Sequence, residues 1–182
     1  MAHVCPWWFV RSFDNPIRRV FHDPEQIFGT WVGPGMHVLD VGCGAGFNSE
    51  GLAQLVGPGG WVVAVDLQPR MLAMTKQRLE RGGLLARADL IHSSADDLGL
   101  DAQTRFGFAV AFWMVHEVPD QERLFGQVRS VLEPGASLLV SEPKLHVSRR
   151  AFEASVQAAQ RAGFSERDRP RIALSRSVLL MR

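Results

Sequence analysis

The sequence predicts a doubly wound α/β fold, in which a mostly parallel sheet of seven strands is covered by helices on both faces. Two observations carry this prediction. From Met36 onward, short apolar runs alternate with longer segments of helical periodicity. The chain has 182 residues, of which 46% are hydrophobic and 21% charged, which is enough for one well-buried core.

The elements follow one another in a regular order. Strands are expected at 36–41, 61–66, 88–94, 106–113 and 133–143, the last after a turn at its "EPG" start, with two short strands near 165–171 and 177–181. Helices are expected near 48–55, from residue 69, after residue 119 and over 148–164. Leu72, Thr75 and Leu79 mark one helical face, and Gly163 is a helix stop.

Charge and composition exclude several classes of protein. The net charge of +1 gives no overall attraction to nucleic acid or to a membrane surface. No apolar run approaches the roughly 20 residues of a membrane span, and we read no signal peptide. Cys5 and Cys43 lie in unlike contexts, so a disulfide is not expected. These features favour a cytoplasmic protein.

The stretch "VLDVGCGAGF" is the most informative part of the chain. Gly42, Gly44 and Gly46 directly follow a strand and allow a ligand to approach the main-chain N–H groups. Asp66 ends the next strand, 20 residues after Gly46, where a carboxylate accepts hydrogen bonds from ribose hydroxyls. The alternatives are a tight turn without a ligand and an aspartate that caps the next helix. Together the features favour a nucleoside-bearing cofactor.

The glycine spacing does not suit a dinucleotide. A G-x-G-x-x-G motif requires its third glycine at position 47, which is Phe47. Asp40 just before the turn repels a pyrophosphate but suits a ligand with an ammonium group. A dehydrogenase is therefore disfavoured.

At this point the sequence resembles a known family. "VLDVGCGAG", "VVAVDLQPRML", "ADDL" and "VRSVLEPGASLLVSEP" are similar to the successive motifs of class I S-adenosylmethionine-dependent methyltransferases, which have a Rossmann-like fold. The similarity is greatest to the small-molecule branch of the ubiquinone/menaquinone C-methyltransferases. It implies S-adenosylmethionine as cofactor, S-adenosylhomocysteine as product and a small-molecule methyl acceptor, with no nucleic-acid partner favoured.

The resemblance also implies which residues bind the cofactor. Asp40, Gly42, Gly44 and Gly46 would hold its methionine part, Asp66 its ribose, and Leu67 and Met71 its adenine. Ser94, Ala95 and Asp96 match the loop near the adenine amino group, and Phe112 and Trp113 would face the methionine chain. Ser94 departs from the usual acid, and Gly107 stands where the family usually has aspartate.

Methyl transfer is an in-line displacement, for which the protein mainly aligns the reacting atoms. His116, after the fourth strand, is the candidate general base, and its alternative is a packing role beneath the loop. Two other readings stay open: a non-catalytic nucleoside-binding or interaction module, and an RNA methyltransferase that uses the arginine-rich C-terminal part. The sequence does not predict the oligomeric state.

The first 35 residues differ from the rest of the chain. We expect a single methyltransferase domain over 1–182, with 1–35 as an N-terminal helical cap or lid and 36–182 as the cofactor-binding core. Trp7, Trp8 and Phe9 would either close over the cofactor or bury the cap. His3 and Cys5 are too few ligands for a metal site, so no metal is expected.

Overall fold

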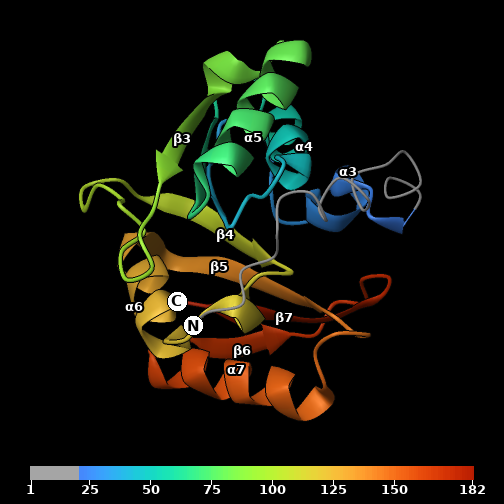
Figure 1. Cartoon of the computed structure of the whole chain (residues 1–182), viewed down its shortest axis with the longest axis vertical. Helices are drawn as coiled ribbons and strands as arrows, with labels where there is room; N and C mark the ends of the chain where they lie inside the picture. Colours follow the sequence, from blue (N-terminus) through green and yellow to red (C-terminus); the bar gives the residue numbers. More distant parts are fainter. Residues whose placement is uncertain (1–20) are drawn as a thin grey trace.

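The structure is a computed structural model that describes residues 21–182, and its centre is one seven-stranded sheet (Figure 1). The strand order is β3-β2-β1-β4-β5-β7-β6. Neighbours from β3 to β5 pair in parallel, and β7 is antiparallel to both β5 and β6. The strands are β1 (His37–Val41), β2 (Trp61–Asp66), β3 (Ala88–His92), β4 (Phe106–Phe112), β5 (Leu132–Pro143), β6 (Ser165–Asp168) and β7 (Ser175–Met181). The predicted mostly parallel sheet is confirmed.

Helices cover both faces of the sheet, as expected for a doubly wound fold. They are α3 (Pro24–Phe28), α4 (Phe47–Val56), α5 (Pro69–Arg81), α6 (Gln121–Val131) and α7 (Arg149–Arg161), with the 3₁₀ helices η1 (Leu85–Arg87) and η2 (Val115–Glu117). Side chains of α3, α4 and α5 share one buried cluster with the sheet, and those of α6 and α7 share another. Figure 1 shows these two helical groups on opposite sides of the strands.

Local sequence signals explain where the helices begin and end. Pro69 lies in the first turn of α5, where its missing N–H costs nothing, and the predicted apolar face of α5 is buried. Ser148 caps α7 by accepting a hydrogen bond from the Ala151 N–H at 3.1 Å. Gly163 has φ +96°, a left-handed conformation that ends the helical path.

Several predicted boundaries differ from the structure, among them the end of β3, at His92 rather than residue 94, and the start of β7, at Ser175 rather than residue 177. Strand β4 ends at Phe112 because Trp113 has φ +61°, outside the extended region. The "EPG" segment lies inside β5, where Leu132 already pairs with Phe106 before a register shift. Strand β6 ends at Asp168, three residues earlier than expected.

The strand order indicates where the candidate ligand site lies. It reverses between β1 and β4, and the carboxyl ends of β1, β2, β4 and β5 meet at one edge of the sheet, where ligands bind in open α/β folds. Of the predicted cap, the described part contains the short helix α3, while Trp7, Trp8 and Phe9 lie outside the described residues. No helix within residues 21–182 combines the length and apolar character needed to cross a membrane.

Candidate functional site

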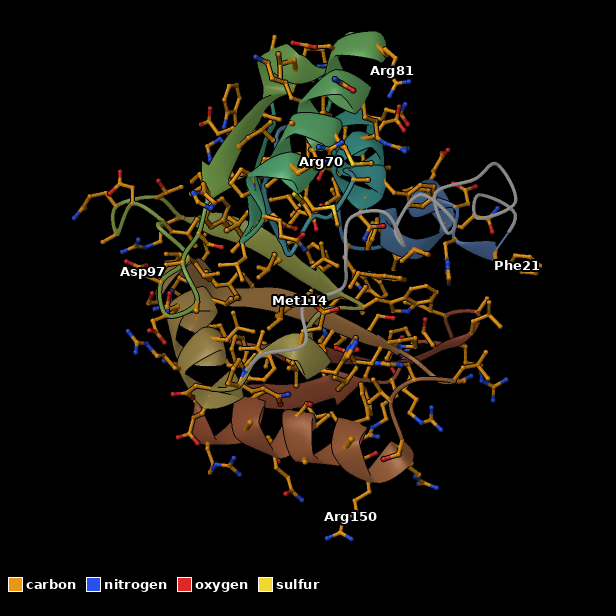
Figure 2. All side chains as sticks on the ribbon, in the orientation of Figure 1. Phe21, Arg70, Arg81, Asp97, Met114 and Arg150 are labelled. Atoms are coloured by element: carbon orange, nitrogen blue, oxygen red, sulfur yellow. The ribbon has the colours of Figure 1, made fainter. Side chains whose placement is uncertain are left out.

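The three glycines of the turn between β1 and α4 have different physical roles. All three have positive φ, at +69° for Gly42, +56° for Gly44 and +79° for Gly46. A Cβ at Gly42 would lie 2.7 Å from Met114 Cγ, and one at Gly46 would lie 2.8 Å from Thr75 Cγ2. A Cβ at Gly44 would meet nothing within 4 Å. Packing therefore excludes a side chain at Gly42, against Met114 (labelled in Figure 2), and at Gly46, whereas Gly44 faces open space.

Asp66 at the end of β2 is bound directly to this turn. Its Oδ2 accepts a hydrogen bond from the Gly44 N–H at 2.9 Å, and its Oδ1 accepts one from the Gln68 N–H at 2.8 Å. Burial raises the pKa of the Asp66 carboxyl, although these two hydrogen bonds oppose the shift. The hydrogen bond from Gln68, the residue before α5, shows that Asp66 also supports the start of the next helix, which was the alternative to ligand binding. Each carboxylate oxygen keeps a second lone pair for a ligand.

Asp40 lies beneath the turn, 1% exposed, and its Oδ2 accepts a hydrogen bond from Ser49 Oγ at 2.6 Å. Ser49 belongs to the first turn of α4, whose N-terminal end favours a negative charge. Cys43, between the glycines, is a buried free thiol. Burial, and then the charges of Asp40 and Asp66, raise the pKa of Cys43 well above its ordinary value, so it stays a neutral thiol.

The residues predicted to lie near the adenine surround the end of β2 and the loop after β3. Leu67 is exposed on the surface, whereas Met71 is buried in α5. Ser94, Ala95 and Asp96 are exposed, and Ser94 Oγ holds the loop by accepting the Asp97 N–H at 3.1 Å. Their contacts with a cofactor stay a prediction.

Aromatic side chains close the end of β4. Trp113 donates a hydrogen bond from Nε1 to Ser175 Oγ at 2.9 Å, at the start of β7. His22, 2% exposed, packs edge-on against Phe112 and Trp113, with ring centroids 5.4 and 5.0 Å away. His22 could not be predicted from the sequence, since only the folded chain brings it to β4.

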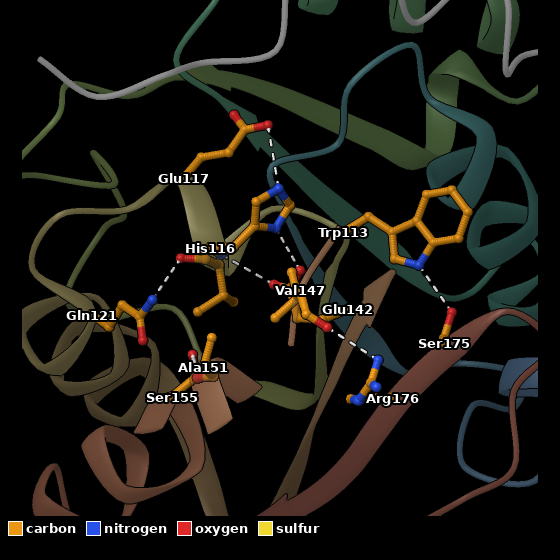
Figure 3. Close-up of polar contacts among 11 residues, drawn as sticks. Trp113, His116, Glu117, Gln121, Glu142, Val147, Ala151, Ser155, Ser175 and Arg176 are labelled. Atoms are coloured by element: carbon orange, nitrogen blue, oxygen red, sulfur yellow. Dashed lines mark hydrogen bonds and ion pairs between the residues drawn. The ribbon is translucent and has the colours of Figure 1, made fainter. Parts of the chain in front are cut away.

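His116 is paired with a buried carboxylate (Figure 3). Glu142, 0% exposed, accepts a hydrogen bond from His116 Nδ1 through Oε2 at 2.5 Å and one from the His116 backbone N–H through Oε1 at 3.2 Å. Glu117 Oε1 lies 3.9 Å from Nε2. Burial lowers the pKa of His116, but the hydrogen bond and charge of Glu142, with the charge of Glu117, outweigh it and raise the pKa overall.

Glu142 is the main functional candidate that sequence reasoning missed. The available signal was an acid at the carboxyl end of an apolar strand, next in the sheet to the strand before His116. With Asp40 and Asp66, Glu142 gives this edge of the sheet three buried carboxylates. The three carboxylates can attract a cationic ligand, and His116 can accept a proton.

The candidate metal pair His3 and Cys5 lies outside the described residues. Between residues 21 and 182, no three His, Cys, Asp or Glu side chains are grouped closely enough to hold a metal ion.

Comparisons with known proteins identify the family. A family profile described as "Methyltransferase domain" matches residues 38–135, more than half of the chain. The chain belongs to this methyltransferase domain family. The matched segment includes the glycine turn, Asp66 and His116, and the predicted resemblance to class I methyltransferases is confirmed.

Individual relatives agree with this membership. The chain is 32% identical over 155 residues to a ubiquinone biosynthesis O-methyltransferase of Xanthomonas axonopodis pv. citri (strain 306), covering 85% of this chain and 62% of that protein. It is 28% identical over 132 residues to the ubiquinone/menaquinone biosynthesis C-methyltransferase UbiE of Pseudoalteromonas translucida (strain TAC 125), covering 71% of this chain and 52% of that protein. The chain thus spans about three fifths or less of the length of these two relatives.

The fold also has a solved counterpart of the same size. A SAM-dependent methyltransferase from Aquifex aeolicus superimposes with a TM-score of 0.87, covering 98% of this chain and 99% of that chain at 23% identity. This likeness confirms the Rossmann-like methyltransferase fold.

Proposed function

We propose that this chain transfers a methyl group from S-adenosylmethionine to a small-molecule acceptor. The observation that carries the proposal is the hydrogen bond of 2.9 Å between the Gly44 N–H and Asp66 Oδ2. It joins the main chain of the turn to the carboxylate at the neighbouring strand end, at the edge of the sheet where ligands bind in open α/β folds.

The residues of this edge suit S-adenosylmethionine. The open space at Gly44 lets a ligand contact main chain, and Asp66 keeps lone pairs for ribose hydroxyls. Asp40 and Asp66 add negative charge for a ligand that carries an ammonium and a sulfonium group. We expect Leu67 and Met71 with Ser94, Ala95 and Asp96 to contact the adenine, and Phe112 and Trp113 to contact the methionine chain.

When bound, S-adenosylmethionine supplies an electrophilic methyl group. The chain's own residues position the acceptor and hold its proton. Because Nδ1 of His116 is bound to Glu142, the Nε2 atom is the one available to take a proton from the acceptor. The raised pKa of His116 makes this nitrogen a stronger base. No side chain becomes covalently attached to the methyl group.

The acceptor is expected to be small, with no nucleic acid as partner. One relative is named an O-methyltransferase and another a C-methyltransferase, so the proposal leaves the methylated atom open. A cytoplasmic location is part of the proposal, since a free thiol such as Cys43 persists in a reducing compartment.

Calorimetric titration with S-adenosylhomocysteine tests the binding half of the proposal. The wild type should bind it with one site per chain, and Asp66→Ala should lose at least about tenfold in affinity because the ribose loses a charge-assisted hydrogen bond. Thr104→Ala, remote from the turn at the opposite edge of the sheet, is the matched control. Absence of binding to the wild type would refute the proposal.

A further inference from the structure

A basic pocket lies next to the candidate site, at the edge of the sheet formed by β7. Its volume is about 570 Å³. In the described chain, β6 pairs only with Leu179–Met181 of β7, so the first half of β7 is left as a sheet edge and the pocket opens there. Phe152 and Ile172 give the pocket an apolar part.

The charge of the pocket is strongly one-sided. Its lining includes Lys144, Arg149, Arg171 and Arg176, in a chain whose net charge is only +1. Glu153 also lines the pocket, but its Oε1 already accepts a hydrogen bond from Arg169 Nη1 at 2.5 Å. A concave surface lined by positively charged side chains concentrates the electric field and attracts anions.

Arg169 of the pocket is paired with Glu153 and Glu166, but three other cations are available to a ligand. Within residues 21–182, no carboxylate oxygen lies within ion-pair distance of Lys144, Arg171 or Arg176. Arg176 is held in place by hydrogen bonds from Nη1 to the Lys144 and Val147 carbonyls, at 3.1 and 3.0 Å. A guanidinium fixed in this way loses less entropy when it binds a carboxylate or phosphate.

The pocket and the candidate site are linked through Ser175 and through the pairing of β5 with β7. Ser175 lines the pocket and accepts the hydrogen bond from Trp113 Nε1. Lys144 follows Glu142 by two residues, and Glu142 pairs with Arg176 in the register of β5 and β7. Figure 3 shows Arg176 bound to the Val147 carbonyl near Glu142. A molecule that places its reacting atom at His116 therefore has this pocket beside it, on the side away from the glycine turn.

From this arrangement we propose that the basic pocket binds the anionic group, a carboxylate or phosphate, of the methyl acceptor, with Phe152 and Ile172 contacting its apolar part. The inference rests on the proposed function. It gives the two neighbouring sites opposite charges: the buried carboxylates would attract the cationic methyl donor, and the arginine and lysine side chains of the pocket would attract an anionic acceptor.

The test measures binding of small probes by calorimetry, with and without saturating S-adenosylhomocysteine. Benzoate and phenyl phosphate represent the two anionic groups, and benzamide is the neutral control. The wild type should bind at least one anion and should bind benzamide more weakly. Lys144→Gln/Arg171→Gln, which removes two charges from the pocket, should weaken anion binding about tenfold.

The matched control is Arg150→Gln/Arg167→Gln, which removes the same charge from residues outside the pocket lining. Figure 2 shows Arg150 extending away from the body of the protein. The control should bind the anions as the wild type does. Equal weakening by both double variants, equal binding of benzamide, or no anion binding would overturn the proposal.

The role in methyl transfer is tested with radiolabelled S-adenosylmethionine and a small-molecule cell extract. The labelled product should be retained by an anion-exchange resin. A labelled product that is neutral would overturn the acceptor role of the pocket while the proposed function stands. A wild type that binds no S-adenosylhomocysteine and yields no labelled product would refute the proposed function itself.

Discussion

Replacing single glycines of the turn by alanine should separate packing from ligand contact. In Gly46→Ala, the new Cβ would lie 2.8 Å from Thr75 Cγ2 and 2.9 Å from Thr75 Cα, at a residue with φ +79°. The left-handed backbone costs about 1–2 kcal/mol, and overpacking against α5 costs about 1–3 kcal/mol. Gly46→Ala should thus lose about 2–5 kcal/mol of unfolding free energy.

Gly44→Ala should behave differently. Its Cβ would meet nothing within 4 Å, so only the backbone cost of about 1–2 kcal/mol applies at φ +56°. The methyl group would instead project into the space where we place the cofactor. We expect a folded protein whose affinity for S-adenosylhomocysteine is at least about tenfold weaker, which corresponds to about 1.4 kcal/mol.

Urea denaturation gives the stability of each variant, and calorimetric titration gives the affinity. The reasoning requires the two effects to separate, with Gly46→Ala the less stable protein and Gly44→Ala the folded protein that binds poorly. If Gly44→Ala bound S-adenosylhomocysteine as tightly as the wild type, close approach of the cofactor to Gly44 would be refuted.

Three further predictions concern the residues around the turn and the base. His116→Ala should lower turnover about 10²-fold or more with cofactor affinity unchanged, and loss of that affinity would assign His116 to structure. Glu142→Gln should move the acidic limb of the pH–rate profile to lower pH, since it removes the charge that raises the pKa of His116; an unmoved limb would contradict the pairing. Thr75→Val, which removes the hydrogen bond of 2.8 Å from Thr75 Oγ1 to the Gly44 carbonyl, should cost about 1–2 kcal/mol in urea denaturation; unchanged stability would show that this bond does not support the turn.

The His116–Glu142 pair also gives a pH dependence of stability with a definite sign. The folded state raises the pKa of His116, so it binds the proton more tightly than the unfolded chain does. The resulting stabilisation is complete below the ordinary pKa of 6.5 and disappears as the pH rises through the folded-state pKa. Glu142→Gln should lose this contribution, which unfolding curves measured on both sides of pH 6.5 would detect.

Much of the fold was predictable because its signals are local. Apolar strands, Pro69 at a helix start and Gly163 at a helix end each act within a few residues. The approach of Asp66 to the turn was also predictable, since the carboxyl ends of adjacent parallel strands share one edge. The early end of β4 was not, because Trp113 takes a left-handed conformation in which its side chain contacts Ser175 and His22, both distant in sequence.

The rest of the site depends on long-range packing that no local pattern contains. Which glycine faces open space is decided by Met114 and Thr75, both distant in sequence. The Glu142 partner of His116 lies 26 residues further along the chain and reaches it only through the pairing of β4 with β5. The basic pocket combines the start of α7 with the edge of β7, so its arginines look like a solvated surface in the sequence alone.

The most direct test of the central claim is transfer of label from methyl-labelled S-adenosylmethionine to a small-molecule extract, with total RNA assayed separately as acceptor. Wild-type protein should give a labelled small molecule, and Asp66→Ala should give almost none. Tight binding of S-adenosylmethionine without any labelled product would contradict the account and indicate a nucleoside-binding module. Label found only in RNA would contradict it as well.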